Sequence, residues 1–170
     1  VAIGSGTLLV DDPLLTARHV YRERPLARVI FDRRLRTPSR ARVFSTLAAG
    51  PVIILTSPQA RQLHSEQADA LAPAGATIEE VGPTMTAAFA TLAQRGIQSV
   101  VLEGGIGVHQ AAWDEALVDY VQLYVAPVTL GPDAPPVAAG PMSAVPSLVD
   151  QKVQMLGPDV LIEGYVHRPH

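Results

Sequence analysis

Two glycine-rich segments contain the residues whose types and spacing suit ligand binding. They are Gly4-Ser5-Gly6-Thr7 and Glu103-Gly104-Gly105-Ile106-Gly107-Val108. Glycine has no Cβ, so a ligand can approach its backbone closely, and the positive end of a following helix attracts an anion. At the second segment we therefore expect the pyrophosphate of a cofactor, and the alternative interpretation is an ordinary turn.

Thr7 is placed to cap a helical turn and so to present backbone N–H groups to a phosphate. By itself the segment also fits a loop, because glycine turns and Asp-Pro pairs such as Asp12-Pro13 are common in loops. A dinucleotide-binding fingerprint of the Rossmann type requires a third glycine where this sequence has Leu9. The sequence therefore argues against a Rossmann domain.

Two charged side chains follow apolar, strand-like segments. The Glu103 carboxylate can accept hydrogen bonds from a substrate amino group or relay a proton, and it can equally cap the N–H groups of the next helix. Arg33 follows Val29–Asp32 directly, where a guanidinium can bind a phosphate, including the 2′-phosphate that distinguishes NADP from NAD. The arginines between positions 33 and 42 also fit an ordinary solvated surface.

The composition narrows the function further. The 170-residue chain has no cysteine, and its five histidines show no metal-ligand spacing, so we expect no metal site. No Ser-His-Asp arrangement can be argued, which leaves the catalytic residues unassigned. A net charge of −3 argues against a nucleic-acid partner. The sequence has no apolar run of about 20 residues and no leader, so we expect a soluble protein, without a membrane partner, in the reducing cytoplasm.

The elements that must position these residues follow from the apolar pattern. Short β-branched runs alternate with Ala-rich segments of helical period, which is typical of an α/β protein with a largely parallel sheet. We expect strands at Val29–Asp32, Val52–Thr56, Thr77–Val81, Ser99–Glu103 and Tyr120–Val128, and helices at Pro58–Leu71, Thr84–Arg95 and Val108–Leu117. The chain should close with an antiparallel hairpin of Lys152–Leu156 and Val160–Val166 around Gly157-Pro158-Asp159.

The chain is long enough for one domain with a hydrophobic core, which we place over residues 1–170. Val1–Gly4 has the pattern of the end of a strand with no element before it, so we expect the natural domain to begin earlier. Five prolines between Gly131 and Pro146 preclude regular structure there, and this segment is expected to be a surface loop.

Three motifs occur together along the chain: Gly4-Ser5-Gly6-Thr7, Asp11-Asp12-Pro13-Leu14-Leu15-Thr16-x-Arg18 and Glu103-Gly104-Gly105. Further matches follow at Pro25–Val29 and at Tyr124-x-Ala126-Pro127. In order and spacing these residues resemble the C-terminal reductase domain of the bifunctional riboflavin deaminase-reductase. The resemblance covers nearly the whole chain, and the run from Asp11 to Arg18 is its most specific part.

The resemblance implies a fold like that of dihydrofolate reductase, with a mostly parallel central sheet flanked by helices and a C-terminal antiparallel hairpin. It also implies NADPH as cofactor and reduction of the ribosyl group of 5-amino-6-(5-phosphoribosylamino)uracil to a ribityl chain. The nicotinamide delivers the hydride and the protein orients the reactants, so no catalytic dyad is expected.

The site residues that the resemblance implies fall into two groups. Cofactor contacts are implied at Thr7, Asp11, Arg33, Gly104, Gly105, Ile106, Gly107 and Val108. Substrate contacts are implied at Leu14 or Leu15, at Arg18 and at Glu103, with Arg18 suited to the sugar phosphate.

The sequence departs from the family in several respects. Ile106-Gly107 stands where the family often has Gly-Thr, which affects the phosphate contact. Set beside the family, this chain is expected to lack the zinc-binding deaminase domain and the usual first strand and first helix. That strand lies in the middle of the family's sheet, so its loss would expose two unpaired strand edges.

Three functions therefore stay open. The first is the reductase of riboflavin biosynthesis, the second is a dihydrofolate reductase-like NADPH oxidoreductase with another substrate, and the third is a non-catalytic remnant that binds the cofactor or dimerises. The resemblance further implies a homodimer, for which the strand Tyr120–Val128 and the terminal hairpin are the candidate interface.

Overall fold

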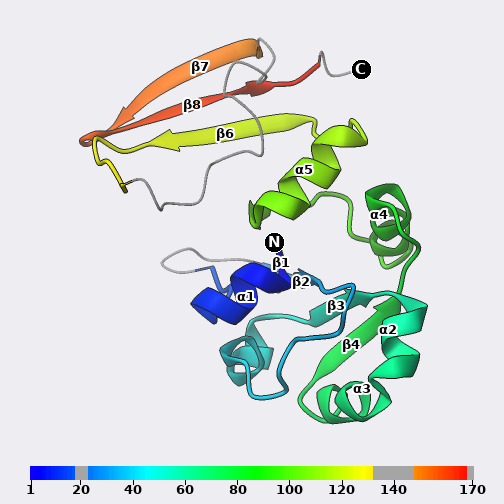
Figure 1. Ribbon diagram of the computed structural model, residues 1–170. Coiled ribbons are helices and arrows are strands. Elements are labelled where there is room, and N and C mark those ends of the chain that lie inside the picture. Colours follow the sequence, from blue (N-terminus) through cyan, green and yellow to red (C-terminus); the bar gives the residue numbers. More distant parts are fainter. Residues whose placement is uncertain (18–22, 132–147, 168–170) are drawn as a thin grey trace. The chain divides into compact units, whose positions relative to one another are not determined.

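The structure is a computed structural model that describes residues 1–17, 23–131 and 148–167 (Figure 1). The chain divides into two compact units, Val1–Ala111 and Ala112–His170. The division falls inside the helix Ile106–Asp114. Each unit has a sheet of its own, and each is described by itself below.

The first unit alternates strands and helices. In chain order its elements are β1 (Ala2–Gly4), α1 (Ser5–Asp11), β2 (Arg28–Phe31), the 3-10 helix η1 (Arg42–Ala49), β3 (Val52–Thr56), α2 (Pro58–Leu63), α3 (Ser65–Leu71), β4 (Ala76–Glu80), α4 (Met85–Gln94), β5 (Leu102–Gly104) and the first part of α5 (Ile106–Asp114). The strands pair in parallel in the order β4-β3-β2-β1-β5. Parallel pairing places the carboxyl ends of all these strands at one edge of the sheet.

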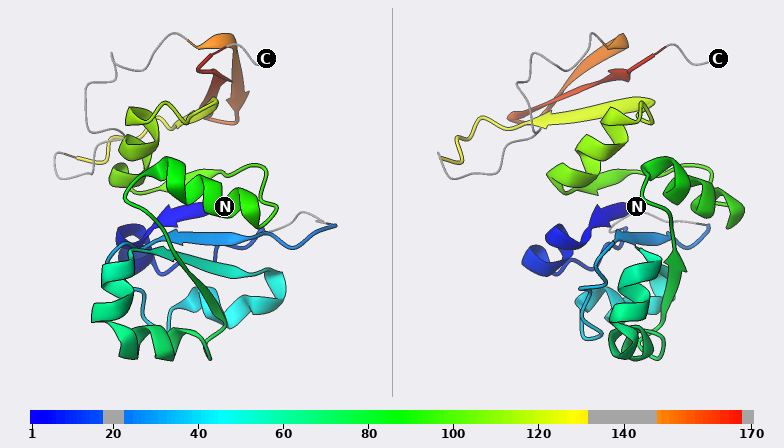
Figure 2. Two further views of the ribbon diagram at one scale, coloured as in Figure 1. Left: turned by 90° about the vertical axis from the view of Figure 1, so that its right-hand side faces the viewer. Right: turned by 45° about the vertical axis from the view of Figure 1, so that its right-hand side comes forward.

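Side chains alternate between the two faces of this sheet, and each face has its own buried cluster. Ile30 and Ile54 point to one face, where residues of α1, η1, α2 and α3 cover them. Val29 and Ile53 point to the other face, which α4 covers. Figure 2 shows helices on both sides of the sheet. Because both faces are buried, these strands are apolar throughout, which is the pattern that the sequence analysis used to find them.

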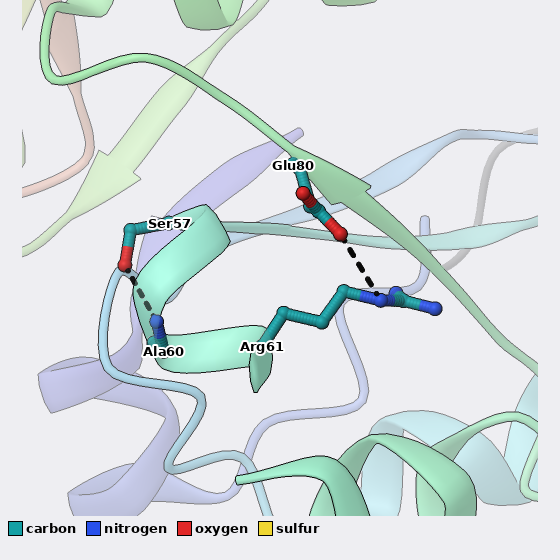
Figure 3. A network of polar contacts seen from close by, with 4 residues as sticks. All are labelled: Ser57, Ala60, Arg61 and Glu80. Atoms are coloured by element: carbon teal, nitrogen blue, oxygen red, sulfur yellow. Dashed lines mark hydrogen bonds and ion pairs between the residues drawn. The ribbon is translucent and has the colours of Figure 1, made fainter. Parts of the chain in front are cut away.

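Helix α2 shows how local sequence defines an element. The Ser57 hydroxyl accepts a hydrogen bond from the Ala60 N–H at 3.1 Å, and Pro58 occupies the first turn (Figure 3). Further along, Arg61 Nε lies 3.3 Å from Glu80 Oε1, which links α2 to the end of β4. Both side chains of this ion pair are substantially exposed, so the cap and the packing of the helix contribute more to local stability than the pair does.

A buried arginine holds the segment in front of β2. Arg28 is 0% exposed, and its Nη1 donates to the carbonyls of Val43 at 2.9 Å and Leu14 at 3.3 Å and to the Thr46 hydroxyl at 2.8 Å. Its Nη2 donates to the Gly50 carbonyl. Burial lowers the pKa of Arg28 from its ordinary value, and these neutral oxygens surround the charge. The guanidinium thereby ties η1 and the Leu14 segment to the sheet.

The second unit contains a three-stranded antiparallel sheet. Its strands are β6 (Tyr120–Val125), β7 (Val149–Leu156) and β8 (Asp159–Tyr165), and β8 lies between the other two. Strands β7 and β8 form the predicted hairpin, in which Gly157 takes a positive φ of 66°. Tyr120 and Tyr165 pack edge to face with ring centroids 4.8 Å apart.

The predicted class is confirmed: an α/β fold with a mostly parallel sheet, flanking helices and a C-terminal antiparallel hairpin. Strand β3 has the predicted bounds, and β2 and β4 each lie one residue earlier than predicted. Strand β6 ends at Val125 and not at Val128. The reason is Pro127, which has no N–H to donate to a neighbouring strand.

Four predicted elements differ more. Strand β7 begins at Val149, three residues before the predicted Lys152. The segment Pro58–Leu71 is not one helix, because the backbone of His64 leaves the helical region at φ −116° and ψ 46° and separates α2 from α3. Strand β5 covers Leu102–Gly104 and not Ser99–Glu103, since its one partner among the described strands is the short β1. Helix α5 begins at Ile106, two residues before the predicted start. The 3-10 helix η1 lies where no element was predicted.

The expectation of one domain over residues 1–170 that begins earlier in the natural protein stays a prediction. Within the described residues, β5 and β6 are outer strands of their sheets. The predicted surface loop Gly131–Pro146 lies outside the described residues apart from Gly131. In the described part of the chain, no helix is both long and apolar enough to cross a membrane.

Candidate functional site

The carboxyl ends of β2, β1 and β5 are neighbours, because these strands are parallel and adjacent in the sheet. The chain passes from β1 directly into α1 after Gly4, and from β5 into α5 after Gly105. Figure 1 shows β1 beside α1. Each glycine-rich segment of the sequence therefore forms a strand-to-helix junction, and the two junctions lie side by side. In open parallel sheets ligands bind outside this edge.

Thr7 packs against the second junction. A Cβ added to Gly104 would lie 3.2 Å from Thr7 Oγ1, and one added to Gly105 would lie 3.4 Å from the same atom. Gly105 also has a φ of +94°, which side chains of L-residues rarely adopt. A Cβ on Gly4 would approach Val108 Cγ2 to 3.0 Å. The structure thus brings four of the predicted cofactor-binding residues together.

One detail of the Thr7 prediction is wrong. Helix α1 begins at Ser5, and its N-cap is Gly4, at φ −80° and ψ 154°, with no side-chain hydrogen bond to cap it. Thr7 therefore lies inside the helix and does not cap it. The extended backbone of Gly4 ends β1 and starts α1 at once, which leaves no turn for Thr7 to cap.

Gly107 differs from the two glycines before it. It lies in the first turn of α5, it is exposed, and a Cβ there would meet no atom within 4 Å. The first N–H groups of a helix have no intrahelical acceptor, and α5 is nine residues long. An anion therefore has open access to this helix start. By contrast, the close approach of Thr7 constrains Gly104, and the φ of +94° constrains Gly105.

Glu103 occupies an irregular position in β5. The register between β1 and β5 shifts here, so that Glu103 has no partner residue on β1. Such irregularities redirect a side chain near the end of a strand, and Glu103 is exposed. His109, one turn into α5, has its ring Nε2 3.1 Å from the Leu102 carbonyl. This contact gives the histidine a structural role beside the site.

The second motif of the sequence starts at the end of α1. Asp11 is exposed, whereas Asp12 adopts a left-handed φ of 41° as the C-cap, and its N–H donates to the Leu8 carbonyl at 3.0 Å. The Asp12 Oδ1 also accepts from the Arg42 N–H at 2.8 Å. Asp12 therefore secures the path of the chain, and the cofactor contact of Asp11 stays a prediction.

Leu14 and Leu15 have different surroundings. Leu15 packs against the buried cluster that contains Ile3 and Leu8, and its φ of 53° is uncommon for a residue other than glycine. The Leu14 carbonyl is bound by Arg28. Both leucines are partly buried. Arg18, the predicted contact to the sugar phosphate, lies outside the described residues.

Arg33 starts a segment of residues 33–36 at the carboxyl end of β2, here named the basic loop. Its Nη1 donates to the carbonyls of Pro83 at 2.7 Å and Gly82 at 3.3 Å, which follow β4. Because β4 and β1 lie on opposite sides of β2 in the strand order, the Arg33 side chain is turned away from Thr7.

Arg36 makes the connection to β1 instead. Its Nη2 donates to the Ser5 hydroxyl at 2.9 Å. The sequence analysis noted Arg36 only as a member of the arginine cluster. No local signal separates it from its neighbours, because its partner lies 31 positions earlier in the chain.

A cavity of about 460 Å³ opens at the other edge of this sheet. Its lining includes Val1, Leu26, Ile97 and Val100, and none of the predicted site residues. The strands begin at this edge, whereas ligands of parallel sheets bind where strands end. We therefore assign the candidate site to the junctions at Thr7 and Gly105 and not to this cavity.

Comparison with known proteins adds a family to this geometry. The chain matches the family model for the RibD C-terminal domain over residues 1–162. It is 31% identical over 165 residues to the riboflavin biosynthesis protein RibD of Bacillus amyloliquefaciens. The aligned region covers 94% of this chain and 44% of that protein. The chain thus spans less than half the length of this relative.

A second curated relative is closer in length. The 2,5-diamino-6-ribosylamino-4(3H)-pyrimidinone 5′-phosphate reductase of Archaeoglobus fulgidus is 25% identical over 179 residues, covering 99% of this chain and 80% of that protein.

Solved structures agree with the sequence matches. A diaminohydroxyphosphoribosylaminopyrimidine deaminase/5-amino-6-(5-phosphoribosylamino)uracil reductase from Thermotoga maritima superposes with a TM-score of 0.74 at 25% identity, over 95% of this chain and 43% of that one. Acinetobacter baumannii RibD superposes with a TM-score of 0.72 at 26% identity, over 95% of this chain and 45% of that one.

Proposed function

This chain belongs to the family of RibD C-terminal domains and has their dihydrofolate reductase-like fold, and from this we propose that it is an NADPH-dependent reductase of riboflavin biosynthesis. It converts the ribosyl group of 5-amino-6-(5-phosphoribosylamino)uracil to a ribityl chain. The names of the relatives from Thermotoga maritima and Archaeoglobus fulgidus include reductases of such pyrimidines. The observation that carries the proposal is the packing of Thr7 against the Gly104-Gly105 corner.

The residues at this corner fit a dinucleotide. The open space beside Gly107, at the start of α5, suits a pyrophosphate, and Ile106 and Val108 lie in the same turn. Thr7 and Asp11, on α1, hold the cofactor from the neighbouring strand end. When bound, NADPH supplies the hydride for the reaction.

The substrate is held on the same edge of the sheet. The Leu15 side chain packs into the core, so Leu14 is the better candidate of the two leucines for contact with the substrate. Arg18 binds the sugar phosphate in this proposal, because a guanidinium matches a phosphate with two parallel hydrogen bonds. Glu103 is exposed at the irregular point of β5, where its carboxylate can accept hydrogen bonds from the pyrimidine amino group.

The chemistry asks the protein mainly to orient the reactants. Opening of the ribose ring leaves a carbon–nitrogen double bond, whose carbon takes the hydride and whose nitrogen takes a proton. When the protein fixes the acceptor carbon against the cofactor, hydride transfer becomes effectively a unimolecular reaction and no longer a bimolecular one. The proton comes from solvent, and Glu103, an exposed carboxylate on β5, can relay it.

The test is NADPH oxidation in the presence of the phosphoribosylamino-pyrimidine, followed by the loss of nicotinamide absorbance. We expect turnover by the wild-type chain and a loss of roughly 100-fold in kcat/KM for Glu103→Gln, which is the usual size of a general acid–base contribution. The Glu66→Gln variant removes another exposed carboxylate, on α3, and should leave the rate unchanged. Binding of NADPH should survive in both variants.

Absence of turnover by the wild-type chain would reject the assignment of this substrate. Reduction of another imine or carbonyl by NADPH, with Arg18→Ala having no effect on it, would show a reductase with a different substrate. Absence of any NADPH binding would reject the enzyme assignment as a whole.

We also propose a homodimer formed through the second sheet. The rows Val125-Val160-Met155 and Leu123-Ile162-Val153 pair across β6, β8 and β7 and place six apolar side chains on one face. Val153 and Met155 are 63% and 64% exposed, and an apolar face of this kind is typical of an interface between proteins. Light scattering should give the mass of a dimer at micromolar concentration and of a monomer for Met155→Glu, whereas a monomeric wild type would refute this.

A cytoplasmic location completes the proposal. It is supported by the cysteine-free sequence, which fits a reducing compartment. Fractionation of cells that express the protein should recover it with cytoplasmic enzymes, and recovery from outside the cell would contradict the proposal.

A further inference from the structure

Buried contacts on the core side of the basic loop hold it in one conformation. Asp32 is 0% exposed, and its Oδ2 accepts hydrogen bonds from the N–H and the hydroxyl of Thr37, each at 2.7 Å. Leu35 is 2% exposed at a φ of 52°, and its N–H donates to the Asp32 carbonyl at 3.0 Å. Because Leu35 turns into the core, Arg34 and Arg36 stand on the outside of the loop.

Further contacts fix both ends of this loop. The Ser57 hydroxyl donates to the Arg33 carbonyl at 2.9 Å, and the Gln67 side-chain amide donates to the Thr37 carbonyl. A ligand that binds here therefore meets a prepared surface, and little ordering of the loop opposes its binding.

Arg36 is the cation of this loop that reaches toward the nucleotide corner. One of its N–H groups is used by Ser5, and a guanidinium has five. The Arg36 side chain is exposed, so its other donors remain accessible to a ligand. Ser5 is only 6% exposed, and its hydroxyl accepts from Arg36 and keeps its own proton to donate. Arg36 and Ser5 together can therefore provide a positive charge and several hydrogen-bond donors to one anion.

The charge balance around the loop favours an anion. Within residues 32–37 there are three arginines, Arg33, Arg34 and Arg36, and one carboxylate, Asp32, which is buried and bonded to Thr37. Among the described residues, the ion pairs made by arginines lie at Arg61 on α2 and at Arg95 just after α4, and not in this loop. The loop therefore presents a local excess of positive charge at the edge of the sheet.

The position of Ser5 relates this excess to the proposed cofactor. Ser5 follows β1 directly and is two residues before Thr7. Strands are spaced by about 4.8 Å, so the end of β2 lies about 10 Å from the end of β5 in the order β2-β1-β5. A dinucleotide whose pyrophosphate sits at the start of α5 can extend its adenosine half across β1 toward the basic loop.

We propose that Arg36 and Ser5 bind the 2′-phosphate of the cofactor and thereby select NADPH over NADH. This inference rests on the proposed function, because it assumes that the corner at Thr7 holds a dinucleotide. It assigns the selection to Arg36, whereas Arg33, which the sequence favoured, is held by the carbonyls of Gly82 and Pro83.

The test is titration of the wild-type chain and its variants with NADPH and, separately, with NADH. In Arg36→Ala the Kd for NADPH should rise roughly 10- to 100-fold, as expected for loss of a charge-assisted contact, and the Kd for NADH should not change. Arg36→Lys keeps the charge without the planar fork and should fall between wild type and Arg36→Ala. Arg40→Ala removes an exposed arginine just beyond the loop and should have no effect.

Competing nucleotides identify the phosphate concerned. Adenosine 2′,5′-bisphosphate should displace NADPH from the wild type much better than adenosine 5′-monophosphate does, and Arg36→Ala should lose that difference. Equal losses of NADPH and NADH affinity in Arg36→Ala would overturn the inference, and so would discrimination that is lost in Arg33→Ala but kept in Arg36→Ala. If the wild type binds neither dinucleotide, the proposed function itself fails; if it binds NADPH but Arg36→Ala is normal, only this inference fails.

Discussion

Gly105 and Gly107 are two positions apart, yet they meet different physical demands. Gly105 has a φ of +94°, so its lack of a side chain is required by the backbone. Gly107 lies in the first turn of α5 with open space around it. Its lack of a side chain affects access to the helix start and not the folding of the junction.

Substitution of each glycine by alanine should therefore change the free energy of unfolding differently. We expect Gly105→Ala to lower the free energy of unfolding by about 1 to 3 kcal/mol, because it places a side chain in a sparsely populated backbone region. Gly107→Ala should be neutral or stabilising by up to about 1 kcal/mol, since alanine favours the helix. Urea unfolding measures both, and equal effects of the two substitutions would contradict the assignment.

Tyr120, in the second unit, provides a test by pH. Partial burial, then the Glu163 carboxylate, raise the pKa of Tyr120 above its ordinary value of 10.0. A tyrosine with a raised pKa in the folded chain holds its proton more tightly than in the unfolded chain. Its contribution to stability is therefore complete below about pH 10 and is lost as the pH rises toward the raised pKa.

Urea unfolding at a series of alkaline pH values should show this loss in the wild type. The slope should diminish in Tyr120→Phe, which has no proton to lose, and in Glu163→Gln, which removes the neighbouring charge. Tyr124→Phe, on the same strand, is the matched control and should retain the slope. A wild-type slope that persists unchanged in Tyr120→Phe would disprove the assignment.

At the scale of elements, short polar contacts decide where helices begin and how neighbouring segments are joined. The Ser57 hydroxyl accepts from the Ala60 N–H at the start of α2 and donates to the Arg33 carbonyl of the basic loop. Thr84 caps α4 in the same way, by accepting from the Ala87 N–H at 3.1 Å. The two caps can therefore be compared directly: both bind a helix N–H, and the Ser57 hydroxyl additionally donates to the basic loop.

We expect Ser57→Ala to cost more stability than Thr84→Ala. Loss of a cap typically lowers the free energy of unfolding by about 1 kcal/mol, and loss of the second hydrogen bond of Ser57 adds roughly another 1 kcal/mol. Thermal or urea unfolding of the two variants gives the comparison. A smaller effect for Ser57→Ala than for Thr84→Ala would show that its contact to the basic loop contributes nothing.

At the scale of the whole molecule, the two units differ in how much of each sheet is buried. All five residues of β3 are buried between helices, whereas most side chains of β6 and β7 are exposed. Local opening of a sheet costs less free energy when fewer apolar contacts must be broken. The second sheet should therefore open more readily than the first.

Amide hydrogen exchange tests this difference along the chain. We expect the slowest exchange in β2 and β3 and clearly faster exchange in β6 and β7, whose hydrogen bonds are lost in smaller openings. Dimerisation through the second sheet should slow exchange in β6 and β7 as the protein concentration rises. Equal protection of both sheets in the monomer would show that they unfold as one cooperative unit.

Local pattern was enough to predict the α/β class, the parallel sheet and the two glycine junctions. The strands are apolar on both faces, and glycines follow at the ends of β1 and β5, so neighbouring residues along the chain carry this information. The break at His64 and the early start of α5 were not predicted, because each depends on how the helix packs and leaves its strand.

Only the tertiary structure decided which side chains meet. Thr7 lies against Gly104 and Gly105 across nearly a hundred positions, and Arg36 reaches Ser5 across 31. The arginines of the basic loop are alike in the sequence. They become different only when Leu35 turns into the core, Arg33 donates to the Pro83 carbonyl and Arg36 donates to the Ser5 hydroxyl. Partners this distant are chosen by sheet order and packing, which no local pattern encodes.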